Sequence, residues 1–179
     1  RMHPVIGDLV SNLFYDGKLR HGENTVEREQ IANKKPYPGA PLVVMDTENQ
    51  TTCATREGSY SRFNEKTAQV CIDLTVEAVR EGIKSVAIIT PYVAQSRLIR
   101  QRLADFPQEA KHVECRTVHR FQGGERDLVI LDTVDTAPLS PGVLLAGHSP
   151  NSSAQNLINV SISRARGKLI IVSDVSYFN

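Results

Sequence analysis

The fold is decided by the stretch Thr117-Val118-His119-Arg120-Phe121-Gln122-Gly123-Gly124-Glu125-Arg126-Asp127 and the apolar run Leu128-Val129-Ile130-Leu131-Asp132 that follows it. A continuous apolar run of this length is typical of a strand buried on both faces of a parallel sheet. Two adjacent glycines before the run let the backbone turn tightly or approach a ligand without a Cβ in the way. Taken alone, the polar part is explained equally well by an ordinary surface turn.

Hydrophobic patterning outside this stretch predicts strands alternating with helices. Asn64 is a good helix N-cap, and Gly82 is a good helix stop. Alternation of this kind implies right-handed crossovers and an α/β fold, with a mostly parallel sheet covered by helices on both faces. Strands are expected at 42–45, 85–90, 113–117, 127–134 and 168–173, and helices at 3–15, 64–82, 92–103 and 155–166.

Three polar stretches separate these elements. Residues 15–41 are expected to form an irregular connection with at most a brief helix. Residues 47–61 are expected to form a loop or an edge hairpin. Residues 137–153, rich in Pro, Gly and Ser, are expected to form a mobile loop. We expect residues 1–179 to fold as a single domain.

Composition excludes several classes of protein. The 40% hydrophobic and 23% charged residues are ordinary for a soluble globular protein. With a formal net charge of +1, nucleic-acid binding would need local clusters of charge. Three widely spaced cysteines, Cys53, Cys71 and Cys115, argue against a disulfide framework or a zinc site. Without a membrane-span or signal-peptide pattern, we expect an intracellular protein, cytoplasmic or nuclear.

The sequence contains no G-x-x-x-x-G-K-[ST] phosphate loop. The only Gly-Lys pairs are Gly17-Lys18 and Gly167-Lys168, and Leu follows both. The chain also begins at Arg1 rather than at an initiator methionine. We therefore expect it to be a fragment of a longer protein.

In an open α/β sheet, ligands lie at the carboxyl ends of the strands, and we expect four motifs to lie at element ends of that kind. Thr90-Pro91-Tyr92-x-x-Gln95 follows a predicted strand and offers a hydroxyl, a stacking ring and an amide. These groups position phosphate and sugar. A proline-terminated strand before a capped helix explains the same residues.

The second motif is the opening stretch. Thr117, His119 and Gln122 are placed to contact a polynucleotide backbone, while Gly123 and Glu125 are placed to approach a nucleotide. His119 by itself is more often an ordinary loop histidine than a catalytic base, so we assign it no proton transfer.

The third motif is residues 159–166, with Arg164 and Arg166 at the end of a predicted helix. Two arginines two apart on a helix point in different directions and have different partners. A guanidinium fork matches a phosphate, but cations also suit a solvated helix end. The fourth motif, Arg1-Met2-His3-Pro4, says nothing on its own.

Together these motifs resemble superfamily 1B helicases, the group of the nonsense-mediated-decay helicase. Residues 1–4 resemble the end of the signature Q-Y-R-M-H-P, and residues 88–95 the segment I-I-T-P-Y-x-x-Q. Residues 117–127 resemble motif V, T-V-D-x-F-Q-G-x-E-x-D, and residues 159–166 resemble motif VI, N-V-A-x-T-R-A-R. Ser61, Asn64 and Thr67 loosely match a further polar patch. The resemblance covers nearly the whole chain, and motifs V and VI together are highly specific.

The resemblance implies a C-terminal, RecA-like motor domain of an ATP-dependent helicase that moves from 5′ to 3′ on single-stranded DNA or RNA. In the family, ATP with Mg²⁺ sits between two such domains, and the first domain brings the phosphate loop and the Mg²⁺ ligands. We expect that first domain on the same polypeptide. Metal ligands are not expected in this chain, and the isolated fragment is expected to be inactive.

The implied site residues fall into two groups. Arg164 is the expected arginine finger and Arg1 a second γ-phosphate contact, while Gly123 and Glu125 lie near the ribose and Arg166 supports the nucleotide site. The residues expected to grip the single strand, mainly through its backbone, are Thr90, Pro91, Tyr92, Gln95, Thr117, Val118 and His119.

The departures from the family pattern are His119 in place of an acid, and Ser161 and Ser163 in place of Ala and Thr. We expect a changed contact at His119 rather than lost activity. Two alternatives remain. One is a non-catalytic docking or nucleic-acid-binding module that keeps the motor fold. The other, a free-standing nucleotide-binding protein, is disfavoured because no turn has the glycine spacing for a pyrophosphate.

Overall fold

A five-stranded parallel sheet forms the centre of the protein. The computed structural model describes residues 2–20, 22, 25–121, 124–142, 145 and 153–178. The strands lie in the order β1-β7-β6-β4-β5, and every neighbouring pair is parallel. The predicted α/β, RecA-like arrangement is therefore confirmed. The strand bounds are β1 Leu42–Asp46, β4 Val86–Thr90, β5 Val113–Thr117, β6 Arg126–Asp132 and β7 Ala165–Ser173.

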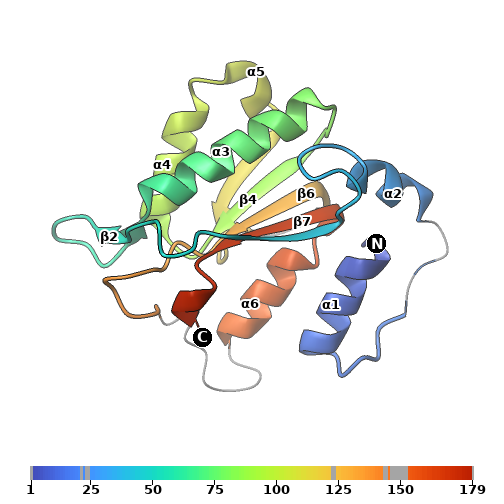
Figure 1. The fold of residues 1–179 in the computed structure, drawn as a ribbon, viewed down its shortest axis with the longest axis horizontal. Coiled ribbons are helices and arrows are strands. Elements are labelled where there is room, and N and C mark those ends of the chain that lie inside the picture. The colour runs from blue at the N-terminus through green and yellow to red at the C-terminus, as the bar shows by residue number, and fades with distance from the viewer. Residues whose placement is uncertain are drawn as a thin grey trace.

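Helices cover both faces of the sheet (Figure 1). On one face lie α3 (Glu65–Arg80), α4 (Val93–Leu103) and the short α5 (Pro107–Ala110), and on the other lie α1 (Pro4–Phe14) and α6 (Ser153–Ile162). The brief helix α2 (Val26–Ala32) packs against β7, and the turn η1 (Ser176–Phe178) lies near the carboxyl terminus. The expected polar stretch before α3 contains a small antiparallel hairpin, β2 (Ala54–Thr55) and β3 (Arg62–Phe63).

Successive residues of each strand point to opposite faces of the sheet, so the apolar side chains form two cores, one on each face. Ile88, Ile130 and Ile170 face α3 and α4, whereas Ala87 and Val129 face α1 and α6. Every residue of β4 is buried, because both of its faces are covered. This explains why the central strands appear in the sequence as unbroken apolar runs rather than as alternating patterns.

The predicted N-cap Asn64 is present, and His3 forms a second N-cap that was not predicted. The Asn64 side chain accepts a hydrogen bond from the Thr67 N–H at the start of α3. His3 caps α1 in the same way, since its Nδ1 accepts from the Val5 N–H, and Pro4 occupies the first helical position. No helix in the described ranges is long and apolar enough to cross a membrane.

The predicted end of the last helix is wrong. The helix was expected to run to residue 166, but α6 ends at Ile162 and β7 begins at Ala165. Arginine and alanine favour a helix here. Pairing with β6 overrides that preference, because the Arg126 N–H donates to the Arg164 carbonyl and Ala165 is buried in the core. The two motif VI arginines therefore lie at a helix-to-strand junction and not on a helix.

A buried lysine fixes the connection between α2 and β1. Lys168 in β7 is fully buried, and its Nζ donates to the carbonyl oxygens of Lys34 and Tyr37 at 2.6 and 2.9 Å. It also donates to the carbonyl of Pro36. An ammonium group has three donors, so this cradle satisfies all of them.

Candidate functional site

The candidate residues separate into two groups at opposite edges of the sheet. Thr90 and Thr117 end β4 and β5 and lie at the carboxyl edge. Arg126 begins β6 beside Ala165 at the start of β7, so Glu125 and Arg164 lie at the amino edge. The expectation that all four motifs lie at carboxyl ends is therefore wrong. Motif VI precedes β7, and motif V leaves the carboxyl edge and returns to the amino edge.

A segment whose described residues form no helix joins the two edges. We call residues 118–125 the crossing segment. At one end the Val118 N–H donates to the Thr90 carbonyl at 3.0 Å, and at the other the Arg126 N–H donates to the Arg164 carbonyl at 2.9 Å. Between them Phe121 is 2% exposed and packs in the core beneath α1 and α6. Val118, in the same core, is also buried, so the described part of the crossing segment connects both candidate groups through two buried side chains.

One glycine in this segment is needed for steric reasons. Gly124 has φ +65, and a Cβ there would lie 2.6 Å from Nη1 of Arg126. The left-handed backbone disfavours any larger residue, whereas the Arg126 guanidinium, at the end of a flexible side chain, can move aside. Gly123, predicted to approach the nucleotide, lies outside the described residues.

The two motif VI arginines have different surroundings. Arg166 lies among three carboxylates, with Glu27 at 2.8 Å, Asp127 at 3.3 Å and Glu125 at 3.7 Å. By contrast, the Arg164 guanidinium has no carboxylate partner among the described residues. The Nε atoms of both arginines are buried without a hydrogen-bond partner there. Buried polar groups are normally paired, so an orphaned guanidinium nitrogen calls for a ligand.

The amino-terminal motif lies beside motif VI. The His3 N–H donates to the Arg166 carbonyl at 2.7 Å, and His3 Nε2 lies 2.8 Å from Oε1 of Glu29. These bonds bring residues 2–4 to the edge that carries Arg164. Arg1 itself lies outside the described residues, so its γ-phosphate role stays a prediction.

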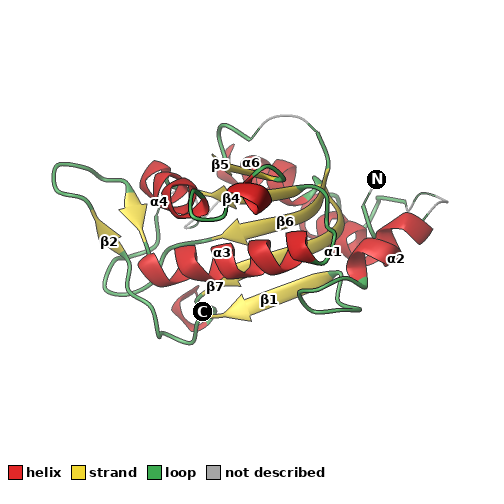
Figure 2. Cartoon of the chain, turned by 90° about the horizontal axis from the view of Figure 1, so that it is seen from above, coloured by secondary structure: helices red, strands yellow, loops and turns green. Residues whose placement is uncertain are grey.

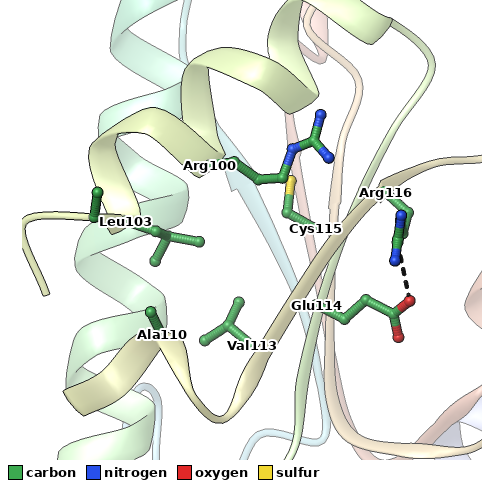
Figure 3. A pocket seen from close by; sticks show the side chains of 8 residues that line it. Arg100, Leu103, Ala110, Val113, Glu114, Cys115 and Arg116 are labelled. Carbon is green, nitrogen blue, oxygen red and sulfur yellow. Dashed lines mark hydrogen bonds and ion pairs between the residues drawn. The ribbon is translucent and has the colours of Figure 1, made fainter. Parts of the chain in front are cut away.

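A cavity of about 320 Å³ opens at the same amino edge. Its lining includes Glu27, Lys34, Lys84, Asp127 and Arg166. A separate cavity of about 360 Å³ lies between α4, α5 and β5 (Figure 3). There Arg116 pairs with Glu114 at 3.1 Å, and none of the predicted site residues takes part. The motif residues therefore favour the amino-edge cavity.

At the carboxyl edge, most predicted strand-gripping side chains are buried. Gln95 is fully buried, and its amide donates to Asp132 Oδ2 at 2.7 Å and to the Asn64 carbonyl at 3.1 Å. The Asn64 N–H in turn donates to Gln95 Oε1 at 2.8 Å. Tyr92 is half-buried and His119 is exposed, whereas the buried members of the group are Thr90, Pro91, Gln95, Thr117 and Val118.

Sequence reasoning missed the centre of this network. Asp132 is fully buried and also accepts from Thr67 Oγ1 at 3.2 Å and from the Val134 N–H at 3.0 Å. The available signal was an acidic residue ending an unbroken apolar strand. It links the end of β6 to the starts of α3 and α4, so it sets the shape of the carboxyl edge.

The Asp132 carboxyl makes the stability of the fold depend on pH. Burial raises its pKa to about 6, although hydrogen bonds from Gln95 and Thr67 act in the opposite direction. The folded chain therefore binds this proton more tightly than the unfolded chain does, and this contribution to stability is lost as pH rises from about 4 to about 6.

We expect the free energy of unfolding of the wild type, relative to Asp132→Asn, to fall by about 2–3 kcal/mol between about pH 4 and about pH 7. Urea denaturation of the two chains across this range measures the difference. A difference that does not change with pH would contradict the raised pKa.

Tyr92 is held by a second buried carboxylate. Its hydroxyl donates to Asp135 Oδ2 at 3.0 Å, and Arg62 donates to Asp135 Oδ1 at 2.9 Å. The Arg62 guanidinium also lies over the Tyr92 ring, with Cζ 5.6 Å from the ring centroid. The Gly142 N–H donates to Asp135 as well, at 2.7 Å. Neither Asp135 nor Arg62 was singled out from the sequence, because their pairing joins residues 73 positions apart.

The sequence of this chain matches those of known proteins over most of its length. The chain matches the family model described as AAA domain over residues 1–176. It is 27% identical, over 97% of its length, to the "Regulator of nonsense transcripts 1 homolog" of Neurospora crassa. It is 28% identical over 97% to the "ATP-dependent helicase upf1" of Schizosaccharomyces pombe, and 31% identical over 75% to the "ATP-dependent helicase NAM7" of Saccharomyces cerevisiae. The aligned region spans 16%, 19% and 14% of these three relatives.

Proposed function

Since this chain belongs to the AAA domain family and is a superfamily 1 helicase domain of the nonsense-mediated-decay type, we propose that it is the C-terminal motor domain of an ATP-dependent helicase. In this proposal the intact protein moves along single-stranded DNA or RNA and hydrolyses ATP. The chain supplies the arginine finger at its amino edge and the strand-gripping residues at its carboxyl edge.

The observation that carries the proposal is the contrast between the two arginines. Arg166 lies among three carboxylates, whereas Arg164 has no carboxylate partner among the described residues; the Nε atoms of both arginines are buried without a hydrogen bond there. A guanidinium stays charged and offers a fork of donors to phosphate oxygens, as is needed to offset charge on a transferred phosphoryl group. We therefore assign the finger to Arg164 and a supporting role to Arg166.

Other groups at this edge complete the nucleotide surface. Glu125 and Gly123 are assigned to the ribose, and Arg1 to a second contact with the γ-phosphate. The sequence has no phosphate loop, so the first RecA-like domain of the same polypeptide would hold most of the triphosphate and its Mg²⁺. The Arg164 guanidinium, which has no carboxylate partner among the described residues, fits an anionic ligand.

The single strand is assigned to the carboxyl edge. Buried side chains there, such as Gln95, cannot read bases, but they fix the backbone and the surface groups of Tyr92 and His119. A surface of this kind suits contacts to the sugar-phosphate backbone, which carry no sequence information. A motor that moves along strands of any sequence needs contacts that do not depend on the sequence.

The crossing segment gives the proposal a route for coupling. In this proposal the two ends of the segment are tied to the two edges, because the Arg126 N–H donates to the Arg164 carbonyl and the Val118 N–H to the Thr90 carbonyl, while Phe121 packs in the core. Nucleotide state at one edge would then bias strand contacts at the other.

One experiment separates this function from a docking module. Residues 1–179 alone should hydrolyse no ATP at a measurable rate, because the phosphate loop is absent. The intact protein should hydrolyse ATP in the presence of Mg²⁺. Hydrolysis by the purified 179-residue chain would contradict the assignment of the triphosphate to another domain.

A further inference from the structure

A hairpin at the carboxyl edge presents an aromatic ring entirely to solvent. Strands β2 and β3 and their connecting turn project from the body of the protein near the start of α4 (Figures 1 and 2). Tyr60 in this turn is 100% exposed. A tyrosine ring carries a large apolar area that folded proteins normally bury at least in part, and here none of it is used within the chain.

The base of the hairpin is firmly anchored. Arg62 pairs with Asp135, whose side chain is 0% exposed, and Ser61 Oγ accepts a hydrogen bond from the Ala94 N–H at 2.8 Å. Strands of two residues are too short to be stable in water by themselves, so these bonds hold the hairpin in place. Because the strands of the hairpin are anchored in this way, Tyr60 is held beside the carboxyl edge with its ring exposed to solvent.

Asp135 and Arg62 also restrict access to the ring of the neighbouring Tyr92. The Tyr92 hydroxyl is bound to Asp135, and the Arg62 guanidinium lies over its ring. A base that stacks on Tyr92 can therefore reach only the ring face away from Arg62. Tyr60, two residues from Arg62, has both faces of its ring open.

The charges in the turn favour a base over a phosphate as the partner. Arg56 and Glu57 are both exposed in the same turn and have opposite signs. The two charges sum to zero, so the turn has no net electrostatic attraction for a polyanion. Stacking of a nucleobase on an aromatic ring needs no charge and is tolerant of sequence.

We propose that Tyr60 stacks on an unpaired nucleobase of the strand bound at the carboxyl edge. The inference rests on the proposed function and adds to it a specific contact and its chemistry. The hairpin, positioned by the Arg62–Asp135 pair, then serves as a stacking element beside the backbone-gripping residues.

The test is the affinity of the full-length protein for single-stranded oligonucleotides, measured by fluorescence anisotropy. Tyr60→Ala should weaken binding to ordinary oligo(dT) or oligo(U) by about tenfold, within the range measured for loss of one stacked base. Tyr60→Phe keeps the ring and should bind as the wild type does. On an oligonucleotide with abasic sites throughout, the wild type and Tyr60→Ala should bind equally, because no base remains to stack.

The control is Tyr37→Ala, which removes an exposed tyrosine in the connection before β1 and should leave affinity unchanged. An equal loss on ordinary and abasic strands would overturn the inference, since the ring would then act through the backbone or the fold. Unchanged binding of Tyr60→Ala to both DNA and RNA would also overturn it, although the proposed function would stand. If the wild type binds neither strand, the proposed function fails as well.

Discussion

Arg164→Ala in the full-length protein is expected to lower kcat for ATP hydrolysis by about 10³-fold at saturating ATP and nucleic acid. Arg164 is the one arginine of motif VI without a carboxylate partner among the described residues, so its charge is available to the developing charge on the γ-phosphate. Alanine removes that charge and its donors while leaving the junction between α6 and β7 intact. Steady-state hydrolysis measures the effect.

Arg80→Ala is a matched control. Arg80 is the last residue of α3, where it pairs with Glu109 at 2.8 Å, on the face of the sheet opposite the one that α6 covers. An exposed pair of this kind contributes little to stability, so kcat should be unchanged. If Arg164→Ala lowers kcat by less than about tenfold, the finger role passes to Arg1 or Arg166.

Phe121→Ala is expected to destabilise the domain by about 3–5 kcal/mol, because it leaves a cavity in a packed core. Phe121 is 2% exposed and is a buried anchor of the crossing segment. Hydrogen exchange at the β6 amides reports this local stability within a longer protein, where global unfolding is not two-state.

Phe121→Leu separates stability from coupling. Leucine keeps most of the buried apolar volume, so the free energy of unfolding should fall by only about 1.5 kcal/mol. In that variant the β6 amides should remain protected, and stimulation of ATP hydrolysis by a single strand should be largely retained. Equal exchange rates in Phe121→Ala and the wild type would contradict the assigned anchor.

The sheet could be predicted because its central strands carry unambiguous signals. Strands covered on both faces appear as unbroken apolar runs, and caps such as Asn64 mark where helices begin. The boundary at residues 162–165 could not be predicted. Local preference there favours a helix, and only the hydrogen bond from Arg126 to the Arg164 carbonyl turns the chain into a strand.

The sequence also could not predict that the site residues lie at two opposite edges of the sheet. Motif V begins after β5 and ends before β6, so its residues are adjacent in sequence but reach opposite edges. The resemblance to motif VI assigned different roles to Arg164 and Arg166, but the carboxylates that surround Arg166 come from α2 and β6 and could not be placed beside it from the sequence. Asp132 and Asp135 escaped notice because their partners are distant in the chain.

The most direct test of the central claim is ATP hydrolysis by the full-length protein, with and without single-stranded DNA and RNA oligonucleotides. The proposed motor predicts Mg²⁺-dependent hydrolysis that one of these strands stimulates, and the stimulating strand identifies the track. Absence of hydrolysis under every condition, from a protein that is folded, would contradict the motor assignment and favour a docking module.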